Sequence, residues 1–143
     1  MKKTIILVLI ALVGIGVGVG YKMATKEHDS TADLEAFHTA TCDEIVQEFL
    51  DDEAASTAKY ADKVIEVSGP IYEMDKTDGK VTSLKLSTDE FNIVSATFQS
   101  PLDVTQVSGD MVSVKGVCSG FNGDSESMLP GGTLELKRCT LVK

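Results

Sequence analysis

The sequence predicts a mainly β fold, a Greek-key barrel of five short strands preceded by one α-helix. Two segments, residues 63–69 and 111–117, are β-branched runs that each follow an aspartate and each contain a glycine. From Asp62 onward apolar and polar residues alternate, which is the period of a strand with one buried face. Before this point apolar residues recur at helical spacing. One helix followed by several short strands is typical of a small barrel domain.

Residues 1–22 are expected to be a hydrophobic N-terminal anchor or signal segment. Residues 4–20 carry no charge and have lysines on both flanks. As a helix this run would be roughly 25 Å long, enough to span a hydrocarbon core of about 30 Å with Tyr21 and the lysines at the interface. The lack of an Ala-x-Ala site favours an uncleaved transmembrane helix, while Gly18 and Gly20 leave a cleaved signal peptide as the alternative.

The flanking lysines also indicate an orientation. Lys2 and Lys3 favour an N-terminus inside the cytoplasm, so we expect a single-pass protein of the cytoplasmic membrane with its domain outside. A cleaved form would be secreted or periplasmic. Residues 23–40 are polar without periodicity, and we expect them to be a tether that leads to the domain, residues 41–143.

The domain is strongly acidic. Beyond residue 26 the chain has nine lysines and arginines against 22 aspartates and glutamates, a net charge of −13. Proteins bind DNA or RNA largely by neutralising phosphates with Lys and Arg. The composition therefore argues against a nucleic acid as the partner, and a surface charged for solubility is the simplest interpretation.

A helix is predicted to begin after Thr41 and to extend to about Ala58. The segment Thr41-Cys-Asp-Glu44 has the form of a capping box, in which Thr and Glu satisfy free N–H groups at the start of a helix. Ile45 and Phe49, one turn apart, belong to an apolar stripe. We expect this stripe to cover one mouth of the barrel.

Five strands are predicted after the helix. Gly69-Pro70 marks a bend in the first strand, and Asp78-Gly79 is a hairpin turn between the first and the second. Residues 101–109 are expected to form a connector, and the glycine-rich residues 119–132 a loop. The predicted strands span residues 63–72, 80–86, 91–98, 110–118 and 133–142.

Three segments of this pattern resemble the tRNA-anticodon-like OB-fold family. They are Tyr60-Ala-Asp-Lys-Val-Ile-Glu-Val-Ser-Gly69, Gly109-Asp-Met-Val-Ser-Val-Lys-Gly-Val-Cys-Ser-Gly120 and Leu134-Glu-Leu-Lys-Arg-Cys-Thr-Leu-Val142. The resemblance covers residues 41–143 and implies the five-stranded, partly open OB-fold barrel. The family includes small bacterial envelope proteins with an N-terminal hydrophobic segment, and the resemblance implies no established substrate, cofactor or catalytic residue.

The inventory of reactive groups argues against an enzyme. The two histidines, His28 and His38, lie in or beside the expected tether, so the barrel has no histidine to activate a serine. No pair of carboxylates stands out with environments that would separate their pKa values. We therefore expect a non-catalytic protein, with no catalytic residue and no cofactor.

No metal site is expected either. His38 and Cys42 are four residues apart, but two ligands fall short of the four that a structural zinc site takes. Residues 122–126 offer oxygen ligands in a glycine-rich loop, yet they lack the spacing of a calcium loop. A solvated turn is the simpler interpretation of this segment.

Cys118 and Cys139 are considered as a disulfide, because a domain outside the cytoplasm would lie in an oxidising compartment. If the last two strands form a hairpin around residues 119–132, Cys118 lies near Leu134, and Cys139 is then five residues, roughly 17 Å, further along. A bulge or a folded-back loop would be needed to bring the two sulfurs together. The alternative is a pair of buried free thiols, with Cys42 as a third cysteine.

A binding face is expected on the second and third strands and their flanking loops, where OB barrels commonly bind their ligands. The sequence offers Tyr72, Lys80, Lys85, Phe91 and Phe121 there. We expect a membrane-tethered binding or accessory module of the cell envelope, whose partner is an envelope protein, a peptide or a small ligand. The alternatives are a nucleic-acid-binding OB-fold protein and a structural or assembly protein without a small ligand.

Overall fold

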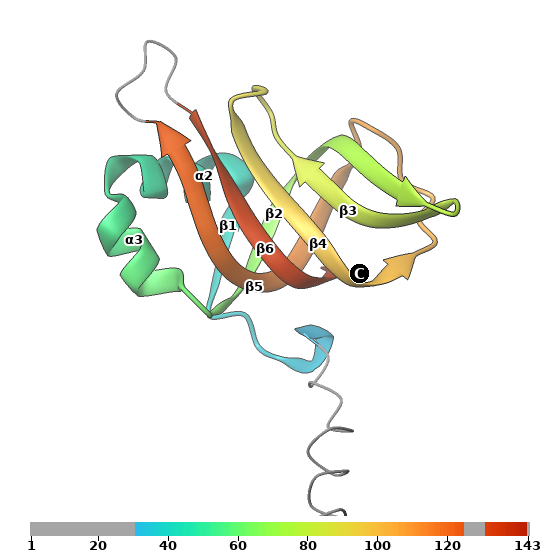
Figure 1. Ribbon diagram of the computed structural model, residues 1–143, viewed down its shortest axis with the longest axis horizontal. Helices are drawn as coiled ribbons and strands as arrows, with labels where there is room; N and C mark the ends of the chain where they lie inside the picture. The colour runs from blue at the N-terminus through green and yellow to red at the C-terminus, as the bar shows by residue number, and fades with distance from the viewer. Residues whose placement is uncertain (1–30, 125–130, 143) are drawn as a thin grey trace, which may run out of the picture. The chain divides into compact units, whose positions relative to one another are not determined.

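A closed barrel of five strands, with two α-helices packed at one end, makes up most of the described structure (Figure 1). The structure is a computed structural model, and it describes residues 31–124 and 131–142. The barrel strands are β2 (Val64–Thr77), β3 (Lys80–Leu86), β4 (Asn92–Leu102), β5 (Met111–Asp124) and β6 (Gly131–Val142).

The connectivity is that of a Greek-key barrel. The strands are hydrogen-bonded in the order β2-β3-β4-β6-β5, and β5 pairs again with β2 to close the barrel. β4 and β6 run parallel, while the other barrel pairs are antiparallel. A five-stranded barrel closed in this order is consistent with the OB fold. The predicted mainly β fold class is confirmed at this level.

The segment that precedes the helices is packed against the barrel, although the sequence predicts a tether up to residue 40. The 3₁₀-helix η1 (Thr31–Asp33) contacts β5 and β6, and a short strand β1 (His38–Thr41) pairs in parallel with β2. The N–H of Phe37 donates a hydrogen bond of 2.7 Å to the carbonyl oxygen of Val64. The predicted tether is therefore wrong for these residues, because a polar segment can still add its backbone to the edge of an existing strand.

The first helix, α2 (Cys42–Asp51), begins with the predicted capping box. The hydroxyl oxygen of Thr41 accepts a hydrogen bond of 3.3 Å from the N–H of Glu44. The Glu44 carboxylate in turn accepts one of 2.9 Å from the N–H of Thr41. These bonds satisfy two groups at the helix start that would otherwise lack a partner, and the predicted start of the helix is confirmed.

The predicted single helix is divided in two at Asp52, which is a correction to the sequence analysis. Asp52 has an extended backbone, with φ −154° and ψ 90°. Its carboxylate accepts a hydrogen bond of 2.9 Å from the N–H of Ala55 and so caps a second helix, α3 (Glu53–Tyr60). Aspartate is strongly favoured at this cap position, and this preference ends one helix and starts the next.

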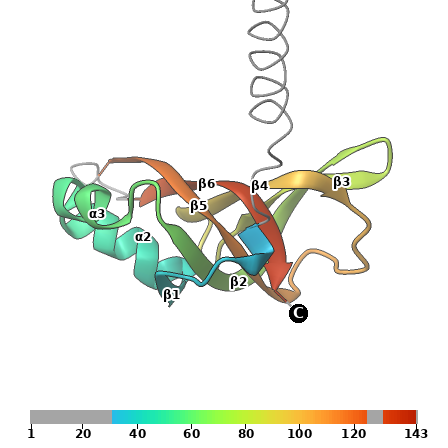
Figure 2. The ribbon, with the colours of Figure 1, turned by 90° about the horizontal axis from the view of Figure 1, so that it is seen from below.

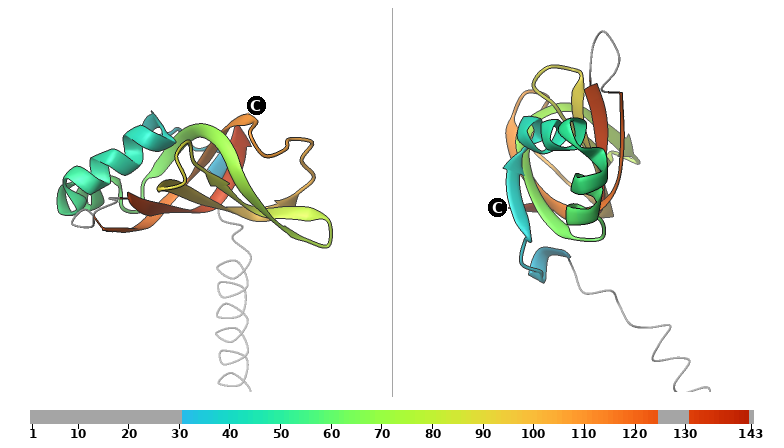
Figure 3. Two further views of the ribbon diagram at one scale, coloured as in Figure 1. Left: turned by 90° about the horizontal axis from the view of Figure 1, so that it is seen from above. Right: turned by 90° about the vertical axis from the view of Figure 1, so that its left-hand side faces the viewer.

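The apolar face of α2 closes one end of the barrel (Figures 2 and 3). Ile45, Val46 and Phe49 are each at most 1% exposed and belong to the same buried cluster as Leu134 of β6. The Phe49 ring stacks on Phe121 of β5 at 5.0 Å between ring centroids. The helix therefore covers a mouth of the barrel, as its apolar stripe predicts.

The hairpin between β2 and β3 turns at Asp78-Gly79, as predicted. Both residues have positive φ angles, 53° and 80°. Asp-Gly favours this backbone conformation in a tight hairpin turn because glycine has no Cβ to clash. The strand that follows, β3, has the bounds predicted for the second strand.

The pairing of β2 with β5 is regular through Gly69 and Pro70, where the sequence predicts a bend. The register of β2 against β3 shifts between Ile71 and Glu73, two residues further on. At Gly69 an added Cβ would come within 2.6 Å of the sulfur of Cys42, at the start of α2. The glycine therefore lets the helix approach the strand closely.

β5 and β6 extend into the segment predicted as a loop. Residues 119–124 and 131–132 belong to these strands, and residues 120–124 pair with residues 131–135, so the loop prediction is wrong for them. A Cβ added at Gly123 or Gly132 would meet the ring of Phe121. Glycines that suggest a loop in the sequence here make room for an aromatic ring over a strand pair.

No helix in residues 31–124 and 131–142 is long and apolar enough to cross a membrane. The predicted anchor, residues 1–22, lies outside the described part of the chain.

Candidate functional site

The connector between β4 and β5 lies on the side of the barrel away from α2 and α3 (Figure 1). Residues of this connector line a cavity of about 480 Å³. Its volume is in the range of small-ligand sites, which is roughly 300–1,000 Å³. It is lined by Ser68, Asp103, Val104, Thr105, Gln106, Met111, Val112, Ser113, Leu141 and Val142.

The connector forms one wall of the cavity. Residues 103–106 belong to no helix or strand, and the backbone of residues 104–106 makes no hydrogen bond within the described structure. The chain then turns back toward β5, since the N–H of Asp110 donates to the carbonyl oxygen of Val107 at 3.1 Å. The carboxylate of Asp110 accepts a hydrogen bond of 3.0 Å from the N–H of Val107. The turn is thus fixed, while the backbone groups of the wall before it have no hydrogen-bond partner among the described residues.

The start of β5 and the end of β6 form the opposite wall. The last pair between these strands joins Ser113 to Val142. β5 begins two residues earlier, at Met111, which pairs with Pro70 of β2. Among the residues that the structure describes, no strand therefore lies beside Met111 and Val112 on the β6 side.

The lining combines hydroxyl groups with apolar side chains. The hydroxyls of Ser68 and Ser113 are 2.6 Å apart and hydrogen-bonded across β2 and β5. Val104, Val112 and Leu141 are partly buried and pack against the barrel core. A ligand that presents both hydrogen-bonding groups and apolar surface would fit such a lining.

One carboxylate lies at the rim. The side chain of Asp103 is 82% exposed, and it lies 3.6 Å from the Lys80 ammonium. Lys80 is itself about half exposed. A surface ion pair of this kind is weak, so Asp103 remains free to meet a charged group of a ligand.

The two lysines of the predicted binding face are both paired with carboxylates. Lys80 contacts Asp103, and the Lys85 ammonium lies 2.5 Å from the Glu73 carboxylate. The hydrogen bond that the Lys85 ammonium donates to the Glu73 carboxylate raises the pKa of Lys85, so this lysine is fully charged at neutral pH. Each positive charge is therefore matched by a negative one, and these two lysines form no basic groove.

Lys85 lies in a row of outward residues that crosses four strands. Its neighbours in register are Glu73 on β2 and Ser95 on β4, and Ser95 in turn faces Glu135 on β6. The row has two carboxylates and one ammonium. A polyanion would be repelled here more than attracted.

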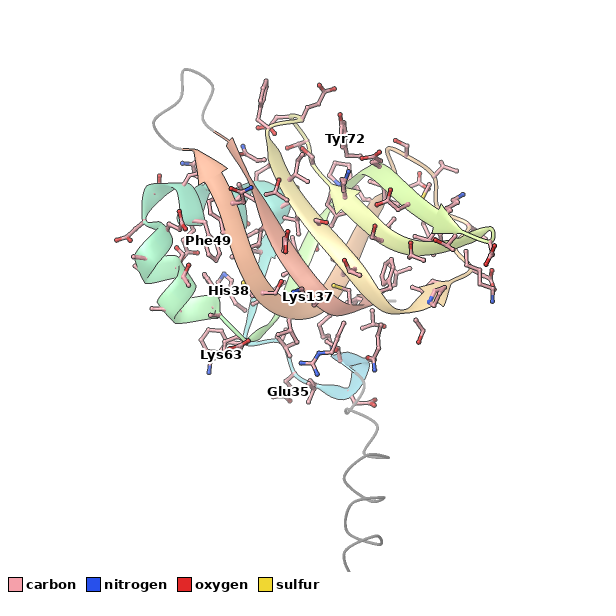
Figure 4. The ribbon with its side chains drawn as sticks, in the orientation of Figure 1. Glu35, His38, Phe49, Lys63, Tyr72 and Lys137 are labelled. Carbon is pink, nitrogen blue, oxygen red and sulfur yellow. The ribbon has the colours of Figure 1, made fainter. Side chains whose placement is uncertain are left out.

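One of the predicted aromatic residues, Phe121, does not lie on the same side of the barrel as Tyr72. Tyr72 is 42% exposed and Phe91 is 50% exposed. Phe121 instead stacks on Phe49 of α2, and Figure 4 shows Phe49 on the opposite side of the barrel from Tyr72. Phe121 is therefore part of the packing under the helix and not of a shared binding surface.

The three cysteines are free and buried, so the disulfide considered between Cys118 and Cys139 is not formed in the structure. Cys118 faces Leu136 across the strand pair, two residues from the predicted register, because the pairing of β5 with β6 continues as far as Asp124 and Gly131. Burial raises the pKa of Cys42 to about 11 and that of Cys139 to about 12. The reactive thiolate form is thus disfavoured.

His38 and Cys42 do not form the start of a metal site. His38 lies on β1, and its ring is 5.3 Å from that of Tyr60, between centroids. In the two described ranges no three side chains of His, Cys, Asp or Glu are grouped to hold a metal ion. Residues 122–126 lie partly outside the described structure.

Sequence reasoning did not identify the cavity. It treats residues 101–109 as a connector, and β4 extends into them as far as Leu102. The one available signal is the segment Asp103-Val-Thr-Gln106. Its valine and threonine are typical of a strand, yet the segment belongs to no strand in the structure.

Several comparisons relate the chain to known proteins. It resembles a Klebsiella pneumoniae lipoprotein that is proposed to bind nucleic acid, with 14% identity, a TM-score of 0.48, and coverage of 83% of this chain and 100% of the other. It also resembles a protein from Leishmania major assigned as an aspartyl-tRNA synthetase (11%, TM-score 0.41) and the aspartyl-tRNA synthetase of Entamoeba histolytica (8%, TM-score 0.36). Both synthetase alignments cover 83% of this chain. The chain spans only 22% and 23% of the length of the two synthetases.

No protein of curated function matches the sequence. The model of the tRNA_anti-like family matches residues 1–129 of the 143 residues. Because this match spans most of the sequence, the chain belongs to the tRNA_anti-like family, the tRNA-anticodon-like OB-fold proteins.

Proposed function

We propose that this protein is a non-catalytic binding module of the cell envelope. In this proposal residues 1–22 hold it in the cytoplasmic membrane, and its acidic OB-fold domain lies outside the cytoplasm. The domain binds a polypeptide or a small ligand and does not bind nucleic acid.

The observation that carries the proposal is the cavity beside the connector of β4 and β5. It combines an adequate volume, the hydroxyls of Ser68 and Ser113, and apolar side chains around them. Loops that a rigid scaffold holds in place often carry the binding residues of a protein. A polypeptide or a small ligand meets the mixed lining better than a row of phosphates does.

The charges support a partner other than nucleic acid. The domain beyond residue 26 has a net charge of −13, and both lysines of the predicted face are paired with carboxylates. A nucleic acid would have to displace Asp103 and Glu73 from these lysines and would then meet further acidic groups. The electrostatic cost of that exchange opposes binding.

A non-catalytic role is supported by the state of the reactive groups. Burial holds the pKa values of Cys42 and Cys139 well above neutral pH, so neither thiol is a ready nucleophile. The one described histidine, His38, packs its ring against Tyr60. Nothing in this arrangement activates a serine or a thiol for attack.

Binding of a single-stranded nucleic acid is the competing function, because the family is defined by likeness to anticodon-binding barrels. A salt titration separates the two. Full-length protein in lipid nanodiscs is mixed with fluorescent single-stranded DNA and RNA between about 50 and 200 mM salt. We expect no saturable binding. Tight binding that weakens steeply with salt would overturn the proposal in favour of the competing function.

The membrane location needs its own test. Cells that express the full chain are fractionated, and the N-terminus of the recovered protein is sequenced. We expect the protein in the membrane fraction with residues 1–22 present. Recovery in the cytosol would reject the proposed location, and a new N-terminus near Tyr21 in a soluble periplasmic fraction would replace the anchor with a signal peptide.

A further inference from the structure

We propose that one side of the barrel docks on the surface of a lipid bilayer. This surface, which we call the Phe37 face, consists of Leu34, Phe37, Lys63, Val64, Lys137 and Arg138. Its apolar side chains enter the boundary between headgroups and acyl chains, and its cations contact lipid phosphates. The inference rests on the proposed membrane location and goes beyond it, because it assigns a second membrane contact to the domain itself.

The apolar part of the Phe37 face lies on the segment between η1 and β1. Leu34 is 39% exposed and Phe37 is 56% exposed. The backbone hydrogen bond from Phe37 to Val64 holds this segment beside the start of β2. Large exposed apolar side chains on a polar surface are typical of a contact with another molecule or with a membrane.

A line of paired residues leads from Phe37 to Lys137 across the outside of the barrel. Val64 pairs with Val117 of β5, and Val117 pairs with Lys137 of β6. Val117 is not a member of the buried core cluster, consistent with a side chain on the outer side. Because neighbouring strands are about 4.8 Å apart, Lys137 lies roughly 14 Å from Phe37. Apolar residues and a cation therefore share one side of the barrel.

An irregularity in β6 adds a second cation to this side. Lys137 and Arg138 are successive residues, yet both are exposed, between the buried Leu136 and Cys139. The register of β6 against β5 shifts at this point, and Arg138 has a positive φ of 52°. In a regular strand one of two successive side chains would point inward. The bulge instead places both charges on the outside.

The cations of the Phe37 face are available to a partner. The ammonium of Lys63 lies 5.7 Å from the centroid of the Phe37 ring. The ion pairs of the described ranges use other lysines, and none includes Lys63, Lys137 or Arg138. Long cationic side chains next to an aromatic ring are typical of a membrane interface, where the stem covers apolar surface and the charge reaches the headgroups.

The carboxylates on this side do not outnumber the cations. Asp33, Glu35 and Asp62 are exposed beside the three cations of the Phe37 face. Glu66 lies next to Lys115 in register, so these two charges also balance. The domain beyond residue 26 has a net charge of −13. Repulsion from an anionic bilayer is therefore weaker on this side than for the domain on average.

The proposed anchor would keep this side close to the bilayer. Thr31 is nine residues beyond the end of the anchor at residue 22. Nine residues span at most roughly 30 Å. A short connection of this kind raises the effective concentration of the lipid surface, so a face with a small apolar area stays docked.

The test uses tryptophan as a reporter, because the sequence contains none. Full-length Phe37→Trp protein is placed in vesicles of phosphatidylcholine and phosphatidylglycerol, with or without bromine on the acyl chains. Bromine quenches tryptophan fluorescence at short range. We expect brominated lipid to lower the fluorescence about twofold, because an interfacial side chain lies about 5–10 Å into the boundary between headgroups and acyl chains. Leu34→Trp repeats the measurement at a second residue of the face.

Tyr72→Trp is the matched control for the place of contact. Tyr72 is also partly exposed, and Figure 4 shows it at the opposite edge of the barrel from Lys63 and Glu35. We expect brominated lipid to leave the fluorescence of this variant nearly unchanged. Equal quenching at residues 37 and 72, or no quenching at both 34 and 37, would overturn the proposal.

Removal of two cations tests the role of charge. In the Phe37→Trp protein, Lys137→Gln together with Arg138→Gln should lower the ratio of docked to undocked domain roughly tenfold, because each cation near an anionic leaflet adds to the attraction. Lys76→Gln together with Lys80→Gln removes the same charge from the hairpin of β2 and β3 and is the control. This control should change the ratio less than about twofold. Equal effects of the two double variants would overturn the assignment to the Phe37 face.

Flotation of the same vesicles separates this inference from the proposed membrane location. Protein that floats with the vesicles but shows no quenching at residues 34 and 37 keeps its anchor and rejects the Phe37 face. Protein that does not float with the vesicles rejects both proposals.

Discussion

The hydroxyl of Tyr60 donates a hydrogen bond of 2.7 Å to Oε2 of Glu48, and this contact joins α3 to α2. The other carboxylate oxygen, Oε1, lies 2.6 Å from the ammonium of Lys59. The Tyr60 ring is fully buried and is in contact with Phe49 of α2 and His38 of β1, at 5.9 and 5.3 Å between centroids. Tyr60 of α3 therefore contacts both α2 and β1 and connects these three elements.

Removal of the Tyr60 hydroxyl should destabilise the domain. We expect Tyr60→Phe to lower the free energy of unfolding by about 1.5–3 kcal/mol, the usual contribution of a hydrogen bond to a charged group. The measurement is unfolding of the full-length protein in urea. Tyr72→Phe is the matched control, because Tyr72 is 42% exposed, and it should change stability by less than about 0.5 kcal/mol. Equal effects of the two variants would contradict a structural role of the Tyr60–Glu48 bond.

The same carboxylate should make stability depend on pH. Its hydrogen bond with Lys59, together with that of Tyr60, lowers the pKa of Glu48 from 4.5. Because the folded pKa is below the unfolded one, the contribution of Glu48 is fully present above about pH 4.5 and is lost as pH falls through the folded value. We expect the difference in unfolding free energy between wild type and Glu48→Gln to shrink from pH 7 to pH 3. A difference that stays constant over this range would show that the charge of the Glu48 carboxylate does not stabilise the folded protein.

The break at Asp52 should depend on the cap that Asp52 supplies to α3. Asp52→Ala removes the acceptor for the N–H of Ala55 and should cost about 1 kcal/mol, as measured by urea unfolding. Asp52→Asn keeps a cap acceptor and is the control, with an expected change of a few tenths of a kcal/mol. If both variants are as stable as wild type, the two helices are held apart by packing alone.

The barrel was predictable because its signals are local. The apolar residues Val81, Leu84 and Leu86, with polar residues between them, indicate β3, and Asp-Gly at residues 78–79 gives the preceding turn. The capping box at Thr41 gives the start of α2. Each signal combines a side-chain preference with a backbone requirement at the same residues, so no knowledge of distant contacts is needed.

The remaining features depend on contacts that are distant in sequence. β1 pairs with β2 through its backbone, and its four residues have no strand pattern of their own. The glycines in residues 119–132 predict a loop. Their role, which is to leave space for the ring of Phe121, depends on the folded structure and cannot be inferred from composition. The candidate cavity is missed for a similar reason: it is defined by where β6 ends relative to β5, which is a property of register.

The cysteines should be protected in the folded protein. Burial raises the pKa of Cys42 to about 11 and that of Cys139 to about 12, from an ordinary value of 9.0. We expect both to resist iodoacetamide at pH 8 in the native full-length protein, and mass spectrometry to find all three cysteines modified after unfolding without a reductant. If only one thiol reacts after unfolding, a disulfide is present and the free state of the cysteines is wrong. Rapid modification of Cys42 in the native protein would contradict its burial.

The approach of Gly69 to Cys42 gives a prediction with a built-in control. A Cβ at position 69 would lie 2.6 Å from the Cys42 sulfur, so Gly69→Ala should push the start of α2 away from β2. We expect a loss of about 1–3 kcal/mol in unfolding free energy, the usual cost of overpacking a core.

The double variant shows whether the sulfur is the cause. Cys42→Ala removes the sulfur but leaves its Cβ, which would be 3.2 Å from the new methyl group. In this background Gly69→Ala should therefore cost clearly less than in wild type, and a double-mutant cycle should give a coupling free energy of roughly 0.5–2 kcal/mol. If the cost of Gly69→Ala is the same in both backgrounds, the glycine is required for the backbone of β2 and not for the passage of the helix over it.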